Sequence, residues 1–237
     1  MFSLPTQSLK GTVSEQEWQA RIDLAACYRL VADMRWGDLI YTHISAKVPG
    51  TEHYLVNAFG LTFDEVTASN LVKVDLDGNI LDDTPYGINP AGFTIHSAIH
   101  EVRHDAECVI HLHTLATISV ASVKGGLKPW SQYSMFSLPS LSYHKYEGLA
   151  VDDAERKRLQ DDLGDTNHML LPNHGGLTLG PTVGDAFMRF YDLQRACEIQ
   201  LALMQSNEEV IEISQPIIDG IYDQAKVVHS GATGGQK

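Results

Sequence analysis

Cysteine is scarce in this sequence, with three among 237 residues, and no two of them form a CxxC pair. Cys27, Cys108 and Cys197 are widely spaced, and two of them lie in strongly apolar segments. This excludes a zinc site built from paired thiolates. We expect reduced, mostly buried thiols in a cytoplasmic protein, because reducing compartments keep such thiols free.

Long apolar runs and basic clusters are also missing. No stretch of about 18 consecutive apolar residues is present, so we expect no membrane-spanning helix. Residues 1–11, MFSLPTQSLKG, lack a basic segment followed by an apolar run, so we expect no signal peptide. Lys and Arg total 17 against 30 Asp and Glu, which gives a formal net charge of −13. The one basic triplet, at 156–158, is flanked by acids, so we expect neither nucleic acid nor membrane as a partner.

The composition is that of a globular protein, with 43% hydrophobic and 20% charged residues. The length suits one domain with a sizeable core, and neither an internal repeat nor a Pro/Gly/Ser-rich linker divides the chain. We therefore predict a single domain over residues 1–237, with its core at about 15–205 and a C-terminal tail at about 206–237. The last residues, HSGATGGQK, are small and polar, and we expect them to be disordered.

Hydrophobic periodicity predicts alternating helices and strands. Helices are expected over 14–34, where Ser14 and Glu17 form a capping box, then over 91–102 after Pro90, from about 116, over 152–163 and over 183–204. Short strands are expected within 39–81, including a hairpin at Asp77-Gly78, then at 108–113 and on both sides of the turn at 172–176. The order of these elements indicates an α/β fold with a mixed sheet.

Two histidines interrupt the apolar segment CVIHLHTLATISVAS. Side chains at i and i+2 of a strand point the same way, so His111 and His113 can converge on one metal ion. The alternative is a pair of hydrogen-bonded core histidines. His174 lies in LLPNHGGLTLG, at a turn whose asparagine and glycines allow a close backbone approach. It is either a third ligand or a solvent-exposed turn residue.

A second histidine series lies on the helix that follows Pro90. His96, His100 and His104 recur at i, i+4 and i+8, so one helix face could hold two ligands. The zincin pattern requires Glu next to the first histidine, and Ser97 stands there. We therefore favour a structural or surface role for these three residues.

Three segments, NPAGFTIHSAIHEVRHDAECVIHLHT, LLPNHGGLTLG and RACEIQLAL, resemble the class II aldolase/adducin family, in its adducin-like bacterial branch. The resemblance covers roughly residues 15–205. It implies a three-layer α/β/α fold with a central mixed, largely antiparallel sheet, and a ring-shaped homotetramer with active sites between subunits. It also implies one divalent ion per subunit, held by His111, His113 and His174. Zinc is the first expectation, and Mn, Fe or Co would also suit three imidazoles.

Two departures from the family pattern bear on the chemistry. Class II aldolases carry SSE before this helix, and its Glu is their general acid/base, whereas here the stretch reads PAG with Gly92 in that position. A glycine cannot transfer a proton. The GN(V/L)S phosphate loop reads THIS at 42–45. Both changes argue against an aldolase or epimerase that acts on a sugar phosphate.

The resemblance therefore favours a metal-dependent lyase acting on a non-phosphorylated keto or hydroxy(aromatic) acid, by decarboxylation or C–C cleavage with the metal as Lewis acid. Decarboxylation needs an electron sink more than a base, so it tolerates Gly92. One alternative is a non-haem Fe(II) oxygenase, although such iron sites usually include a carboxylate. The other is a non-catalytic adducin-like scaffold.

Further candidate site residues lie in three other segments. Tyr143, His144 and Tyr146 of LSYHKYEG are either proton donors near the metal or residues that pack an ordinary strand. The substrate-binding candidates occupy positions like the family's substrate loops, and they are Tyr41, His43, Phe59, Gly60 and Gly92. Their aromatic character favours a ring or apolar acid over a phosphate.

Overall fold

The computed structural model describes residues 7–148 and 153–229. The helices are α1 (Glu15–Asp33), α2 (Pro90–Val102), α3 (Leu115–Ala121), α4 (Gln132–Ser137), α5 (Asp153–Leu163), α6 (Val183–Ser206) and α7 (Gln215–His229). The strands are β1 (His43–Lys47), β2 (Tyr54–Val56), β3 (Val72–Val74), β4 (Cys108–Leu112), β5 (Leu141–Tyr143), β6 (His168–Leu171) and β7 (Gly175–Gly180). Two 3-10 turns, η1 (Phe63–Glu65) and η2 (Leu138–Ser140), complete the set.

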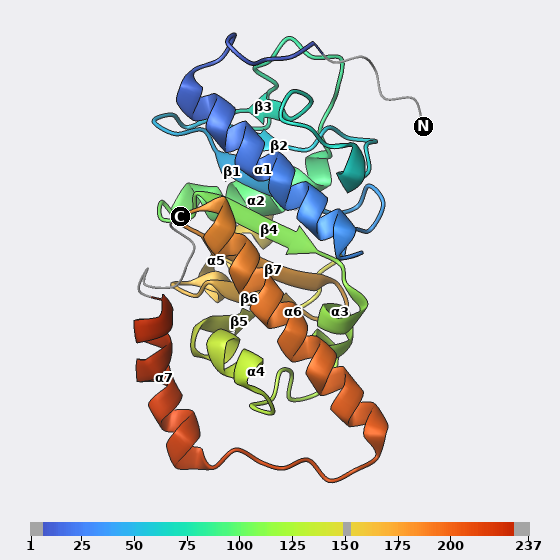
Figure 1. Cartoon of the computed structure of the whole chain (residues 1–237), viewed down its shortest axis with the longest axis vertical. Coiled ribbons are helices and arrows are strands. Elements are labelled where there is room, and N and C mark those ends of the chain that lie inside the picture. The colour runs from blue at the N-terminus through green and yellow to red at the C-terminus, as the bar shows by residue number, and fades with distance from the viewer. Residues whose placement is uncertain (1–6, 149–152, 230–237) are drawn as a thin grey trace.

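The strands form one seven-stranded sheet in the order β3-β2-β1-β4-β7-β6-β5 (Figure 1). Only β5 and β6 pair in parallel among these strands, so the sheet is mixed and largely antiparallel as expected. β4 lies in the centre between β1 and β7. In the β1–β4 ladder His43 stands directly opposite His111, which places two histidines side by side at the end of the central strand.

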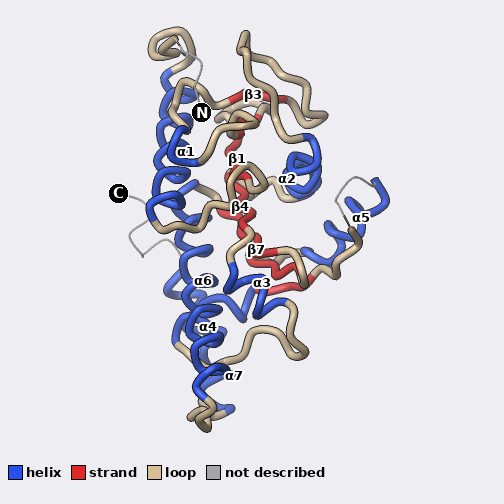
Figure 2. Tube along the Cα trace, turned by 90° about the vertical axis from the view of Figure 1, so that its right-hand side faces the viewer, coloured by secondary structure: helices blue, strands red, loops and turns tan. Residues whose placement is uncertain are grey.

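Helices cover both faces of the sheet, which confirms the three-layer α/β/α arrangement. Seen edge-on, α1 and α6 lie on one side of the strands, and α2 and α5 lie on the other (Figure 2). β4 serves both layers because successive side chains of a strand point to opposite faces. Its residues Cys108, Ile110 and Leu112 join the core under α1 and α6. Val109 joins the core under α2 and α5, so His111 lies on the α2 side.

Local signals explain where the two site-framing helices begin. The Ser14 hydroxyl accepts a hydrogen bond from the Glu17 N–H at 3.1 Å, so α1 starts at Glu15. The Asn89 side chain accepts one from the Gly92 N–H at 3.4 Å, and α2 starts at Pro90, where a missing N–H costs nothing. The predicted starts of both helices lie within one residue of those observed.

Some elements differ from the sequence-based expectation. The strand expected from residue 39 begins only at His43, because Arg35 and Leu39 adopt left-handed backbone with φ of 58° and 51°. The hairpin at 72–81 is reduced to β3 and one bridge, since the Asp75 carboxylate binds the N–H groups of Asp77 and Asn79. α4 and α7 were not predicted. The tail from 206 includes α7, which packs against α4, while residues 230–237 and the Asp152 cap lie outside the described residues.

The three cysteines are free and buried. Burial raises the pKa of Cys27 and of Cys197 to about 12, so both thiols are uncharged and unreactive. Within residues 7–148 and 153–229, none of the helices combines the length and apolar character needed to cross a bilayer.

A buried polar chain links α2 to β1. The Ser45 hydroxyl lies 2.7 Å from His96 Nδ1 and 2.8 Å from His100 Nε2. His100 Nδ1 lies 3.1 Å from the Ala106 carbonyl oxygen. A carbonyl only accepts, so Nδ1 of His100 carries the proton and its Nε2 accepts from Ser45. The first two histidines of the i, i+4, i+8 series are thus core residues, whereas His104 is exposed.

These buried histidines predict a loss of stability in mild acid. Burial lowers the pKa of His100 to about 3 and that of His96 well below its usual value. Below pH 6.5 the unfolded chain binds protons that the native state refuses, so the free energy of unfolding should fall from about pH 6.5 towards pH 3. The expected slope is up to about 1.4 kcal/mol per pH unit for each histidine. Urea unfolding at pH 7 and pH 5 would measure it. A smaller slope is expected for His100→Asn, and a pH-independent wild type would contradict the prediction.

Candidate metal centre

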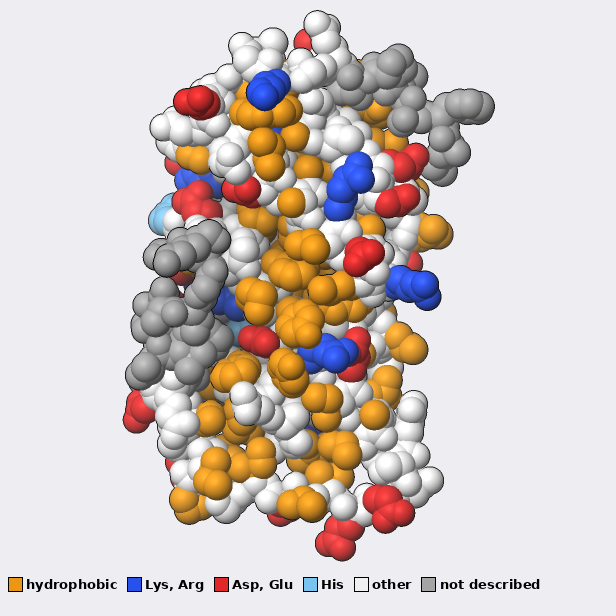
Figure 3. Space-filling model, in the orientation of Figure 1, with side chains coloured by type: hydrophobic (Ala, Val, Ile, Leu, Met, Phe, Trp, Pro, Cys, Tyr) orange, Lys and Arg blue, Asp and Glu red, His pale blue; other side chains and the backbone are white. Residues whose placement is uncertain are grey.

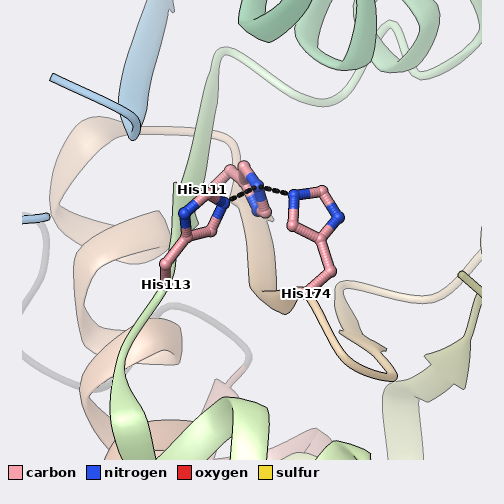
Figure 4. Close-up of side chains that lie close together, drawn as sticks. All are labelled: His111, His113 and His174. Atoms are coloured by element: carbon pink, nitrogen blue, oxygen red, sulfur yellow. Dashed lines mark hydrogen bonds between the residues drawn. The ribbon is translucent and has the colours of Figure 1, made fainter. Parts of the chain in front are cut away.

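Three histidines meet where β4 ends (Figure 4). His111 lies in β4, His113 follows the strand's last residue, and His174 lies in the turn between β6 and β7. His111 Nε2 is 3.0 Å from His113 Nε2 and 3.2 Å from His174 Nε2. The three predicted ligands therefore present one nitrogen each to a common point, within 4.8 Å of one another.

The hydrogen-bond partners show that two of these nitrogens are unprotonated and carry a free lone pair. His111 Nδ1 lies 3.1 Å from the Gly176 carbonyl, and His113 Nδ1 lies 3.2 Å from Asp38 Oδ2. Both partners accept only, so each Nδ1 carries the proton and each Nε2 is unprotonated. The lone pairs of His111 Nε2 and His113 Nε2, two atoms 3.0 Å apart, repel each other, and a bound cation would relieve this repulsion. Nitrogens about 2.1 Å from one tetrahedral ion would be about 3.4 Å apart, so the donor set fits a metal ion.

The protonation states suit a metal ligand set as well. Burial and the neighbouring imidazoles lower the pKa of His111 well below its usual value. Burial, followed by His113, lowers the pKa of His174 to about 4. Burial also lowers the pKa of His113, although Asp38 opposes the shift. All three rings are therefore neutral at pH 7, as metal coordination requires.

The turn that carries His174 depends on its neighbours. Asn173 adopts left-handed backbone with φ of 60°, which asparagine tolerates better than most residues. Gly175 allows β7 to approach the end of β4. A Cβ at this position would lie 2.5 Å from the Leu112 carbonyl oxygen and 3.1 Å from His113 Cδ2. The NHG sequence thus brings a residue 61 positions further along the chain against the HxH pair.

Gly92 faces His43 at the start of α2. A Cβ at position 92 would lie 2.0 Å from His43 Nε2, so the imidazole fills the space of a side chain there. The Asn89 side-chain oxygen caps the Gly92 N–H. The Asn89 side-chain nitrogen, Nδ2, can then donate to His43 Nε2, 3.5 Å away. The ring centres of His43 and His111 are 6.1 Å apart. Burial lowers the pKa of His43 to about 3, so a neutral imidazole fills the space next to Gly92.

The proton-donor candidates of LSYHKYEG are separated by the structure. The Tyr143 hydroxyl accepts a hydrogen bond from the Leu127 N–H at 2.8 Å, and His144 is buried 2.7 Å from Asp162 Oδ2. These two residues thus make structural contacts. Tyr146 is 52% exposed, with its ring centre 6.4 Å from that of His174. Of the three, Tyr146 is the one whose ring contacts a member of the triad.

The other substrate-binding candidates lie in loops. Tyr41 is exposed in the loop before β1, and Phe59 is exposed in the turn after β2. Gly60 follows with φ of 94°, a backbone conformation that favours glycine. Within the described part of the chain, these three residues form no hydrogen bond, ion pair or ring contact with the histidine triad.

Two residues near the triad were missed from the sequence. Arg156 of α5 lines a small pocket beside His174, together with Thr94, Ile95, Glu155, Leu159 and Leu171. Its guanidinium donates to Ser97 Oγ at 2.6 Å and to Glu101 Oε2 at 3.1 Å. In the sequence, the basic triplet that contains Arg156 bore only on nucleic-acid and membrane partners. Asp38 gave no signal either, because its contact with His113 depends on loop geometry.

The protein is an α/β/α scaffold with three imidazoles at the end of its central strand, and comparisons with known proteins identify the family of this fold. A model of the class II aldolase and adducin N-terminal domain matches residues 22–201. A Pseudomonas aeruginosa protein provisionally named a class 2 aldolase is 56% identical over 234 residues, covering 99% of this chain and 90% of its own. The chain belongs to the class II aldolase and adducin family.

Two further relatives are a bacterial protein of known structure and a mammalian adducin. The crystal structure of an aldolase II superfamily protein from Pseudomonas syringae has a TM-score of 0.91 and 51% identity, covering 95% of this chain and 91% of its own. Alpha-adducin of Rattus norvegicus is 43% identical over 210 residues, which cover 85% of this chain but only 28% of adducin. This chain therefore matches about a quarter of that relative's length.

Proposed function

We propose that this protein is a divalent-metal-dependent lyase that acts on a non-phosphorylated keto or hydroxy(aromatic) acid. The observation that carries the proposal is the convergence of three neutral imidazoles, from His111, His113 and His174, on one point. We propose one ion per subunit, with zinc first and Mn, Fe or Co as alternatives. A bound divalent ion would supply Lewis-acid stabilisation of negative charge on a substrate oxygen.

The residues around the triad favour decarboxylation. Loss of CO2 requires a place for the electron pair of the broken C–C bond, and it requires no carboxylate base to remove a C–H proton. Gly92 supplies no such base, and the imidazole of His43 fills its space. The exposed Tyr146 hydroxyl is the candidate that would return a proton to the product carbon, since its ring lies beside His174.

The substrate would be an acid without a phosphate group. Thr42 and Ser45, in the segment where family aldolases bind phosphate, are fully buried, and the Ser45 hydroxyl is engaged by His96 and His100. Neither hydroxyl is available to a phosphate. The pocket beside His174 is lined by Ile95, Leu159 and the Arg156 side chain, but it has room for only about one water molecule. It would have to widen, with Arg156 leaving Ser97 and Glu101, before an acid could bind there. We expect Tyr41, His43, Phe59 and Gly60 to border the substrate.

We further propose a cytoplasmic homotetramer with sites between subunits. The three free, buried thiols are typical of a reducing compartment. Apolar side chains gather along the middle of the face that α1 and α6 cover (Figure 3). The exposed large apolar residues of these two helices are Ile22 and Leu30 of α1 and Met188 and Met204 of α6. A surface of this kind is typical of contacts between subunits.

Metal analysis and a substrate screen test the proposal together. Purified protein should contain about one ion per chain, and keto or hydroxyaromatic acids should release CO2 with that ion bound. His111→Ala should lose both the ion and the activity, whereas His104→Ala, at an exposed histidine, should keep both. A wild type without bound metal, and with no gain from added Zn²⁺, Mn²⁺ or Fe²⁺, would overturn the proposal. That result would favour a non-catalytic adducin-like scaffold. Consumption of O2 by the Fe²⁺-loaded protein would instead favour a non-haem Fe(II) oxygenase.

A further inference from the structure

Asp38 presents a carboxylate to the histidine triad. It lies in the loop between α1 and β1, and its Oδ2 is 3.2 Å from His113 Nδ1. The side chain of His113 is 19% exposed and that of Asp38 is 43% exposed, so the contact is at the edge of the site. We propose that Asp38 is a positioning residue that orients His113 towards the metal ion. This inference rests on the proposed metal site and adds a residue to it.

The chemistry of the pair explains why a carboxylate is useful here. A neutral imidazole has two tautomers, and only the one protonated at Nδ1 offers Nε2 as a ligand. An ionised carboxylate accepts hydrogen bonds and donates none, so Asp38 selects that tautomer. The Gly176 carbonyl oxygen of β7 selects the same tautomer of His111, because it lies 3.1 Å from His111 Nδ1. His113 lies beyond the last residue of β4, so Asp38 takes the place of a ladder carbonyl.

The loop that carries Asp38 is built to hold it in place. Arg35 and Leu39, on either side of it, adopt left-handed backbone, which costs about 1–2 kcal/mol for each residue without glycine's freedom. Trp36 anchors the loop, since it is 9% exposed with its ring centre 6.0 Å from that of Phe190 in α6. The Tyr41 N–H donates to the Asp38 carbonyl and closes the turn. Backbone strain of this kind persists only where surrounding packing enforces it.

The test compares metal affinity across three variants. Asp38→Ala removes the acceptor, Asp38→Asn keeps an acceptor oxygen without the charge, and Asp33→Ala removes an exposed acid at the end of α1. The dissociation constant for Zn²⁺ would be measured by competition with a chelator, and the visible spectrum of Co²⁺-loaded protein would report ligand geometry. The melting temperature of metal-free protein would report stability.

We expect Asp38→Ala to weaken Zn²⁺ binding by about 10- to 100-fold, the usual effect of losing a partner of a histidine ligand. The Co²⁺ spectrum should change, and Asp33→Ala should match the wild type. Asp38→Asn should recover only part of the affinity, because its amide can also donate to Nδ1 and favour the other tautomer. The metal-free melting temperature should stay the same in all variants. Equal Zn²⁺ affinity in Asp38→Ala and wild type would overturn this inference alone, as would an equal loss in Asp33→Ala. A wild type that binds no ion would overturn the metal site as well.

Discussion

Arg21→Ala is expected to destabilise the protein by about 3–5 kcal/mol, which is typical of breaking a buried ion pair from one side. The Arg21 side chain is fully buried in α1 and makes three hydrogen bonds. It donates to Glu17 at 2.9 Å, to Asp82 at 2.7 Å and to the Leu71 carbonyl at 2.8 Å. Removing the guanidinium leaves two carboxylates with side-chain exposures of only 8% and 14%. Lys73 alone would then neutralise both of them.

Equilibrium unfolding in guanidinium chloride would measure this effect. Arg195→Ala is the matched control, because Arg195 forms an exposed pair with Glu198 at 2.7 Å and should cost no more than about 1 kcal/mol. If Arg21→Ala cost as little as Arg195→Ala, the buried network would contribute nothing beyond an ordinary surface pair.

Restoring the family's acid by Gly92→Glu is expected to destabilise the fold by about 2 kcal/mol or more. The new Cβ would start 2.0 Å from His43 Nε2, and overpacking of this kind costs about 1–3 kcal/mol. The carboxylate would add a desolvation cost at a buried position. Gly92→Ala should show the steric part alone. Denaturant unfolding would measure both variants, and Gly87→Ala is the control, since a Cβ there meets no atom within 4 Å.

The same clash predicts that the two positions are coupled. Shortening His43 to alanine frees the space, so His43→Ala/Gly92→Glu should be more stable than the sum of the single variants predicts, by about 0.5–3 kcal/mol. Strict additivity would show that the ring moves aside freely and that position 92 can accept a side chain without help.

The convergence of the three histidines was predictable because its signals are local. The spacing of His111 and His113 follows from the period of a strand, and the NHG turn identified His174 as a candidate for presentation at the sheet edge. The same periodicity located α1, α2 and β4. The six-residue α4 is too short to show such a pattern. The sequence of α7, QPIIDGIYDQAKVVH, does carry an amphipathic pattern, which we overlooked in the tail.

The remaining site features depend on register and loop geometry. The contact between His43 and Gly92 requires the pairing of β1 with β4 and the packing of α2 over both strands. Nothing within either segment encodes it. Asp38 reaches His113 because two non-glycine residues adopt left-handed backbone, and Arg156 enters the pocket from a helix that looks solvated. Tertiary structure alone brings these side chains to the triad.

The triad lies at the junction of the two parts of the sheet. Strands β1 to β4 form one part and β5 to β7 the other, and the β4–β7 ladder joins them. An ion held by His111, His113 and His174 would act as a crosslink across this junction. Separating β4 from β7 would then require release of the ion, and an ion at 100 times its dissociation constant would add about 2.7 kcal/mol to that step. The amides of this ladder should thus be where hydrogen exchange slows most on metal loading.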